Sequence, residues 1–115
     1  MPRTAFNTKG LPNEAEQTLK TVGANFAVAR KRRRLKMEDI AQRIHCTRQT
    51  IAKIENGNPA VAIGVWINYA FVLDLMDGFL EICKPDNDLK GMWMDKESRS
   101  NLQRIRTKHD KELDF

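Results

Sequence analysis

The sequence has few of the residues that build loop-rich or cross-linked scaffolds. Its 115 residues include four Pro, six Gly and two Cys, too few for a coil-dominated fold or a disulfide framework. Cys46 and Cys83 lack C-x-x-C spacing, and His45 and His109 add no ligand pair at a usable distance along the chain. We therefore expect a reducing cytoplasmic setting, a fold held by an apolar core, and neither a metal site nor a cofactor.

Long apolar runs are also missing. The N-terminal stretch MPRTAFNTKGLP has no apolar segment of the kind that secretory signals carry. The longest apolar-rich stretch, residues 61–73, contains Asn68 and is too short to cross a bilayer. No Ser–His–Asp or Cys–His arrangement and no glycine-rich phosphate loop is present. These absences predict a non-enzymatic protein without a membrane partner.

The charge that is present favours an anionic partner. Lys and Arg outnumber Asp and Glu by 20 to 15, and the sequence pI is about 9.5, a balance common in proteins that bind nucleic acid. Residues 30–34, extended by Lys36, form a basic run. This run is either a solvated helix end, where cations are favoured, or a set of phosphate contacts.

Periodic apolar residues predict an all-α fold of five core helices. Asn13 is expected to cap the first helix with Glu16 in capping-box position, and Gly23 predicts a kink or a late start in it. Thr47 is a good N-cap for the third helix, and Gly57 is typical of a helix end that needs positive φ. The expected helices are 13–33, 37–44, 48–55, 63–73 and 76–83.

The composition divides the chain into three parts. Residues 1–12 are expected to be a flexible arm, and residues 13–84 a folded domain. Residues 85–115 form a charged C-terminal tail that begins with a linker, 85–91, and is expected to contain one helix at 96–111. Trp93 in this tail either folds back onto its own domain or docks a partner protein.

The second and third helices and the tight turn between them have the pattern of a helix-turn-helix. Such a motif places its second helix in the major groove. There Arg48 can donate two hydrogen bonds to guanine, and Gln49 can pair with adenine. Thr50 and Lys53 follow on the same outward face and complete the expected base-contacting set.

The segment LKMEDIAQRIHCTRQTIAKIENG resembles the Xre/Cro-repressor family, and the resemblance extends over residues 22–82. It implies a five-helix, lambda-repressor-like DNA-binding domain, with an ion pair between Arg30 and Glu55. Residues expected at DNA phosphates are Arg33, Arg34, Lys36, Thr47 and Asn56. The sequence departs from the family at Lys36, Met37, His45 and Ala62, which replace a helix cap, a phosphate-contacting polar residue, a turn glycine and a second cap.

A narrower resemblance is to HipB-type antitoxins, carried by ANFAVARKRRRLKMEDIA, GNPAVAIGVWINYAFVLDLMD and the closing KELDF. It implies a repressor that silences its own toxin–antitoxin operon and binds a HipA-like kinase toxin. A stand-alone phage or plasmid repressor is one alternative, and a protein-interaction module without DNA binding is another. Because such DNA readers bind double-stranded palindromic operators as dimers, we expect a homodimer. The residues expected at its interface or at a partner are Trp66, Phe71, Leu75, Phe79 and Trp93.

Overall fold

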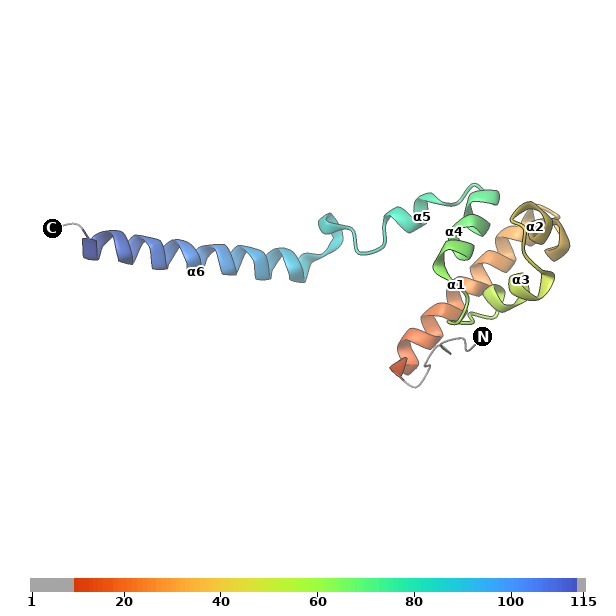
Figure 1. Cartoon of the computed structure of the whole chain (residues 1–115), viewed down its shortest axis with the longest axis horizontal. Helices are drawn as coiled ribbons and strands as arrows, with labels where there is room; N and C mark the ends of the chain where they lie inside the picture. Colours follow the sequence, from red (N-terminus) through yellow and green to blue (C-terminus); the bar gives the residue numbers. More distant parts are fainter. Residues whose placement is uncertain (1–9, 114–115) are drawn as a thin grey trace, which may run out of the picture. The chain divides into compact units, whose positions relative to one another are not determined.

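The computed structural model describes residues 10–113, and its regular structure in this range is all helical. The expected all-α class is confirmed. The chain divides into two compact units, Met1–Phe79 and Leu80–Phe115, a boundary that lies earlier than the one predicted after residue 84. The elements in order are α1 Asn13–Arg32, α2 Met37–Arg43, α3 Arg48–Glu55, α4 Ile63–Val72, α5 Asp77–Leu80, the 3-10 helix η2 Pro85–Asn87, and α6 Leu89–Leu113 (Figure 1).

Helices α1 to α4 surround one apolar core in the first unit (Figure 1). Phe26 of α1 contacts two aromatic rings of α4, with centroid distances of 5.7 Å to Trp66 and 4.7 Å to Tyr69. Phe79 packs on the same Phe26 ring from α5 at 6.5 Å. The fully buried isoleucines of α2 and α3 complete the core, and they are Ile40, Ile51 and Ile54.

Helices α1, α2, α3 and α4 are each closed by a hydrogen bond from a backbone N–H to the carbonyl five residues earlier. At the end of α3, the Gly57 N–H donates to the Ile54 carbonyl and the Asn58 N–H donates to the Lys53 carbonyl, both at 2.9 Å. This Schellman arrangement needs a residue with positive φ just past the helix. Gly57 occupies that position at φ 75°, whereas the other three helices use the non-glycine residues Arg34, His45 and Asp74.

The predicted start of α1 is wrong in one detail. Asn13 is the first helical residue rather than the cap, because Pro12 already occupies the cap position in an extended conformation. The Pro12 carbonyl accepts from the Glu16 N–H at 3.1 Å, so no capping box forms around Asn13. Residues 1–9 of the predicted arm lie outside the described residues.

The C-terminal helices also differ from the expectation. The predicted helix 76–83 is reduced to α5, four residues long, and Cys83 beyond it has positive φ. The predicted linker 85–91 instead contains η2 and the start of α6, because the Asp88 Oδ1 accepts from the Gly91 N–H at 2.8 Å and caps the helix. Helix α6 is therefore longer than predicted, and residues 92–108 along it are all exposed.

Two glycines allow the backbones of α1 and α3 to touch. Helix α1 is continuous across Gly23, so the kink or late start predicted there is wrong. A Cβ atom at Gly23 would lie 2.8 Å from the Glu55 carbonyl oxygen and closer still to that of Ile54. At Gly57 a Cβ would lie 2.6 Å from the Cα of Lys20. The end of α3 is thus fitted directly against the middle of α1.

We predict that Gly23→Ala destabilises the fold by about 1–3 kcal/mol, because the added methyl group overlaps the α3 carbonyls. Helix propensity alone predicts the opposite sign, a gain of roughly 0.5–1 kcal/mol. Gly64→Ala in α4 is the matched control, since nothing lies within 4 Å of its added Cβ, and it should show that gain. Urea unfolding of both variants measures the difference. Equal stabilisation by the two substitutions would contradict the close contact.

Candidate nucleic-acid interface

Polar side chains fix the starts of α2 and α3. The Asp39 Oδ2 accepts from the Lys36 N–H at 2.7 Å, so a carboxylate inside α2 supplies a cap contact although Lys36 itself cannot. Thr47 caps α3 as predicted, since its Oγ1 accepts from the Thr50 N–H at 3.2 Å. Between the helices His45 adopts φ 56°, the left-handed conformation that glycine would take at lower cost.

Helix α3 has one buried face and one exposed face. Ile51 and Ile54 have no exposed area and attach the helix to the core. On the outer face Arg48, Gln49 and Lys53 are exposed, and Thr50 is half-buried with its hydroxyl 3.0 Å from that of Thr47. The structure therefore brings the four predicted base-contacting residues onto one short, outward-facing helix.

A buried polar network anchors the end of this helix. Arg30 of α1 donates from Nε and Nη2 to the two Glu55 carboxylate oxygens, at 2.8 and 3.0 Å. Its Nη1 donates to the Leu35 carbonyl at 2.9 Å, and the Tyr69 hydroxyl of α4 donates to Glu55 at 2.8 Å. The hydrogen bond to Glu55 raises the pKa of Arg30 against the opposing effect of burial. Removing one partner of such a buried pair costs about 3–5 kcal/mol.

Comparison with known proteins agrees with this geometry. A family model described as a helix-turn-helix domain matches residues 21–79, which span α2, the turn and α3 together with most of α1, α4 and part of α5. The chain belongs to the helix-turn-helix domain family. Neither the curated proteins nor the solved structures include a match to the chain.

Arg48, the first residue of α3, takes part in a surface ion pair. The Arg48 Nε lies 3.1 Å from the Glu38 Oε1 of α2, and both side chains are more than half exposed. Sequence reasoning assigned Arg48 to base contacts and gave no role to Glu38. The only available signal was an acidic residue in the first turn of α2, which is also typical of an ordinary helix start.

The basic residues at the end of α1 make different contacts. Arg30 points into the buried network, and Arg33 donates from Nη1 to the Ala29 carbonyl at 2.9 Å. Arg34 occupies the left-handed position after α1. Arg33, Arg34 and Lys36 are exposed, as are Thr47 and Asn56 at the two ends of α3. All five proposed phosphate contacts of the helix-turn-helix domain are therefore accessible.

The proposed interface residues fall into two groups. Trp66 has 6% of its surface exposed and packs on Phe26, so it belongs to the core and the expectation that it lies at an interface is wrong. Phe79 is half-buried against the same core. Phe71, Leu75 and Trp93 are exposed. Sequence reasoning missed Ile63, which is 65% exposed on the same helix as Phe71.

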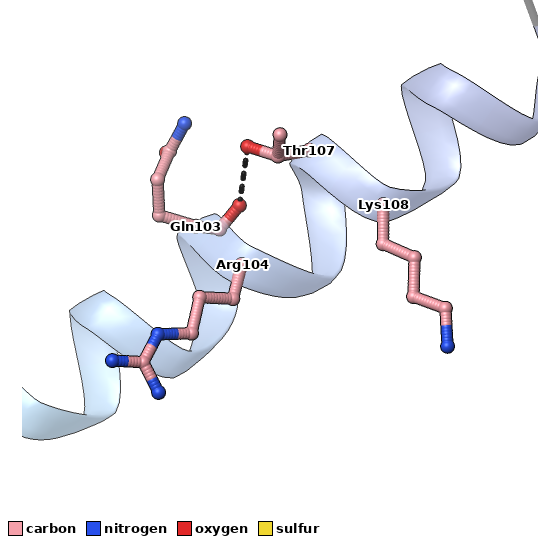
Figure 2. Close-up of a pocket in the computed structure, with 4 residues that line it drawn as sticks. All are labelled: Gln103, Arg104, Thr107 and Lys108. Carbon is pink, nitrogen blue, oxygen red and sulfur yellow. Dashed lines mark hydrogen bonds between the residues drawn. The ribbon is translucent and has the colours of Figure 1, made fainter.

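Surface hollows on α6 are shallow and are formed by single stretches of helix. One is lined by Gln103, Arg104, Thr107 and Lys108, and the Thr107 hydroxyl there donates to the Gln103 carbonyl at 2.9 Å (Figure 2). Its hydroxyl therefore bonds to the helix's own backbone, while the two cationic side chains extend outward (Figure 2).

Other kinds of site receive no support from the part of the chain that the structure describes. Among the side chains that the structure describes, those of residues 10–108, no group of three His, Cys, Asp or Glu could hold a metal ion. Burial raises the pKa of the Cys46 thiol, which favours its unreactive protonated form. None of the helices described is long and apolar enough to cross a lipid bilayer.

The buried network predicts a specific loss of stability in alkali. Burial, together with the hydrogen bond to Glu55, raises the pKa of the Tyr69 phenol. Because the folded state disfavours the phenolate, the phenol's stabilising contribution is complete below the ordinary tyrosine pKa of about 10 and is lost as the pH rises beyond it. We expect Tyr69→Phe to remove this part of the pH dependence and to cost about 1.5–3 kcal/mol at neutral pH.

Urea unfolding of wild type and Tyr69→Phe across the alkaline range measures the difference between them. Tyr69 is the only tyrosine, so ultraviolet absorbance follows its ionisation without interference from another phenol. Ionisation of Tyr69 at its ordinary pKa while the protein remains folded would contradict the network.

Proposed function

We propose that the chain is a sequence-specific transcriptional repressor that inserts α3 into the major groove of double-stranded DNA. The observation that carries this proposal is the division of α3 into two faces. Ile51 and Ile54 fix the helix to the core, while Arg48, Gln49 and Lys53 remain exposed. A helix held rigidly with polar donors outward meets the geometric requirement for reading base edges.

Each exposed side chain of α3 has a chemistry that suits a base edge. Arg48 offers paired donors for guanine O6 and N7, and Gln49 matches adenine N6 and N7. Lys53, one turn further on, reaches a guanine or a phosphate. The Thr50 hydroxyl shares a hydrogen bond with Thr47, which leaves the Thr50 methyl group available for a thymine methyl.

The phosphate contacts surround this helix. Exposed cations and polar groups at the end of α1 and at both ends of α3 provide the sequence-independent part of binding, and the net charge of +5 favours association with DNA. These contacts set the register of the protein on the duplex. The proposed set is Arg33, Arg34, Lys36, Thr47 and Asn56.

The outer surface of α4 supports a homodimer. Ile63, Ile67 and Phe71 follow one another at intervals of four residues, so they form one stripe along the helix. Ile63 and Phe71 are 65% and 64% exposed, Ile67 between them is half-buried, and Leu75 just beyond α4 is 47% exposed. Contiguous exposed apolar surface of this kind is typical of association sites. A two-fold dimer of this domain would read a palindromic operator.

We predict that site selection from random DNA recovers a palindrome with wild-type protein, and that Arg48→Ala loses the preference at one base pair in each half-site. The expected cost of the substitution is about 1–3 kcal/mol of binding free energy on the selected site. Arg99→Ala is the matched control, because it removes the same charge from an arginine of α6 that pairs with Asp95. A titration of wild type against salt should give a steep log–log slope, of about −0.9 per phosphate contact.

Two results would contradict the proposed function. A flat salt response of wild-type protein would favour a protein-interaction module without DNA binding. An equal loss of affinity for every sequence on changing Arg48 would show that this arginine contacts no base.

We further propose that the repressor is the antitoxin of a toxin–antitoxin operon and that its C-terminal unit binds a HipA-like kinase. The support is the surface of α6, where large apolar side chains stand in solvent. Trp93 is 63% exposed, and its neighbour Met94 and the more distant Leu102 and Ile105 are also exposed. A charged helix with an exposed tryptophan and methionine has the composition of an interface rather than of a spacer.

We predict that the chain co-purifies with a kinase-like protein encoded beside it, and that Trp93→Ala weakens this complex by about 2 kcal/mol or more, as for an interface anchor. Arg48→Ala is the control, since it should leave kinase binding intact while impairing DNA binding. Isothermal titration of the two purified proteins measures the affinity of each variant for the kinase. DNA binding without any kinase binding would favour the stand-alone repressor.

A further inference from the structure

Helix α2 carries two neighbouring carboxylates with different partners. Asp39 accepts from the backbone N–H of Lys36 and so belongs to the helix start. Glu38 instead reaches across to α3, where its Oε1 lies 3.1 Å from the Arg48 Nε. The two side chains of this pair are 56% and 57% exposed. Exposed pairs of this kind add little to folding stability, so the effect of this pair must be sought in the position of Arg48.

The contact is an ion pair in which the carboxylate comes closest to the guanidinium group at Nε. Arginine has five N–H donors in a planar fork, and the carboxylate lies beside the one on Nε. The other donors of the group are carried by its two terminal nitrogens, Nη1 and Nη2. Their spacing matches that of guanine O6 and N7, so an arginine held through Nε can still make a bidentate, end-on contact with guanine.

We propose that Glu38 is a specificity-determining positioning residue that holds Arg48 for end-on recognition of guanine. This inference rests on the proposed insertion of α3 into the major groove. Holding the guanidinium reduces the number of side-chain conformations that binding must select. The carboxylate also offsets the arginine charge, which weakens attraction of Arg48 to phosphates of any sequence. Glu38 therefore lowers non-specific affinity and raises preference for guanine at the same time.

The experiment compares Glu38→Ala and Glu38→Gln with wild-type protein on the selected operator. Affinity is measured for the guanine at the Arg48 position, for the three other bases there, and for DNA of random sequence. Glu81→Gln is the matched control, because it changes the net charge by the same amount at an exposed residue of the second unit that pairs with Lys84. Circular dichroism verifies that each variant is folded.

If Glu38 positions Arg48, Glu38→Ala lowers the preference for guanine at that one base pair by roughly 3- to 10-fold, while affinity for random DNA rises. The released arginine gains a phosphate contact, so the salt slope steepens by about 0.9. Glu38→Gln keeps the length of the side chain and an oxygen atom that can face Nε, so it should retain more of the preference than Glu38→Ala. The control variant should leave base preference unchanged.

Distinct results overturn the inference and the proposed function. Unchanged guanine preference in Glu38→Ala would show that Arg48 needs no support. A change at a different base pair would show that Glu38 itself accepts from a base, as carboxylates do from cytosine N4. Absence of any sequence preference in wild-type protein would instead contradict the proposed DNA reading.

Discussion

The orientation of α3 depends on the hydrogen bonds that the Glu55 carboxylate accepts. Glu55 closes α3, and its carboxylate receives two hydrogen bonds from Arg30 of α1 and a third from Tyr69 of α4. A helix of eight residues is too short to be stable by itself, so tertiary contacts must determine the direction in which α3 points. The glycine contacts between α1 and the end of α3 act at the same junction, where backbone meets backbone without an intervening side chain. The contacts at the buried C-terminal end of α3 therefore determine the direction in which its exposed face points.

Local patterns were sufficient to predict the helix-turn-helix itself. The bounds of α3, the Thr47 cap and the positive φ of Gly57 all follow from residue chemistry within a few positions. The inward isoleucines were readable from their spacing. The Arg30–Glu55 pair connects residues 25 positions apart, and it was expected from the family resemblance rather than from any local pattern.

Features that depend on distant partners could not be predicted. Considered within α1 alone, Gly23 predicts only a weakened helix. Its role is to leave room for the backbone of α3, which packs directly against it. An apolar helix such as α4 gives no sign of which aromatic faces inward, so Trp66 could not be separated from Phe71 by pattern. The capping role of Asp88 was hidden in a polar stretch that also fits a linker. The approach of Glu38 to Arg48 depends on the angle between two helices, which sequence spacing does not encode.

The exposure of α6 has a consequence for how this protein can diversify. Residues 92–108 contribute no buried side chain to a core, so most substitutions along that stretch carry little folding penalty. The requirements of folding therefore place few limits on which side chains this stretch of α6 can carry. Residues of α1 to α4, by contrast, are constrained by packing around one core. Sequence change can therefore accumulate in α6 without loss of the fold, at positions where the first unit would lose stability.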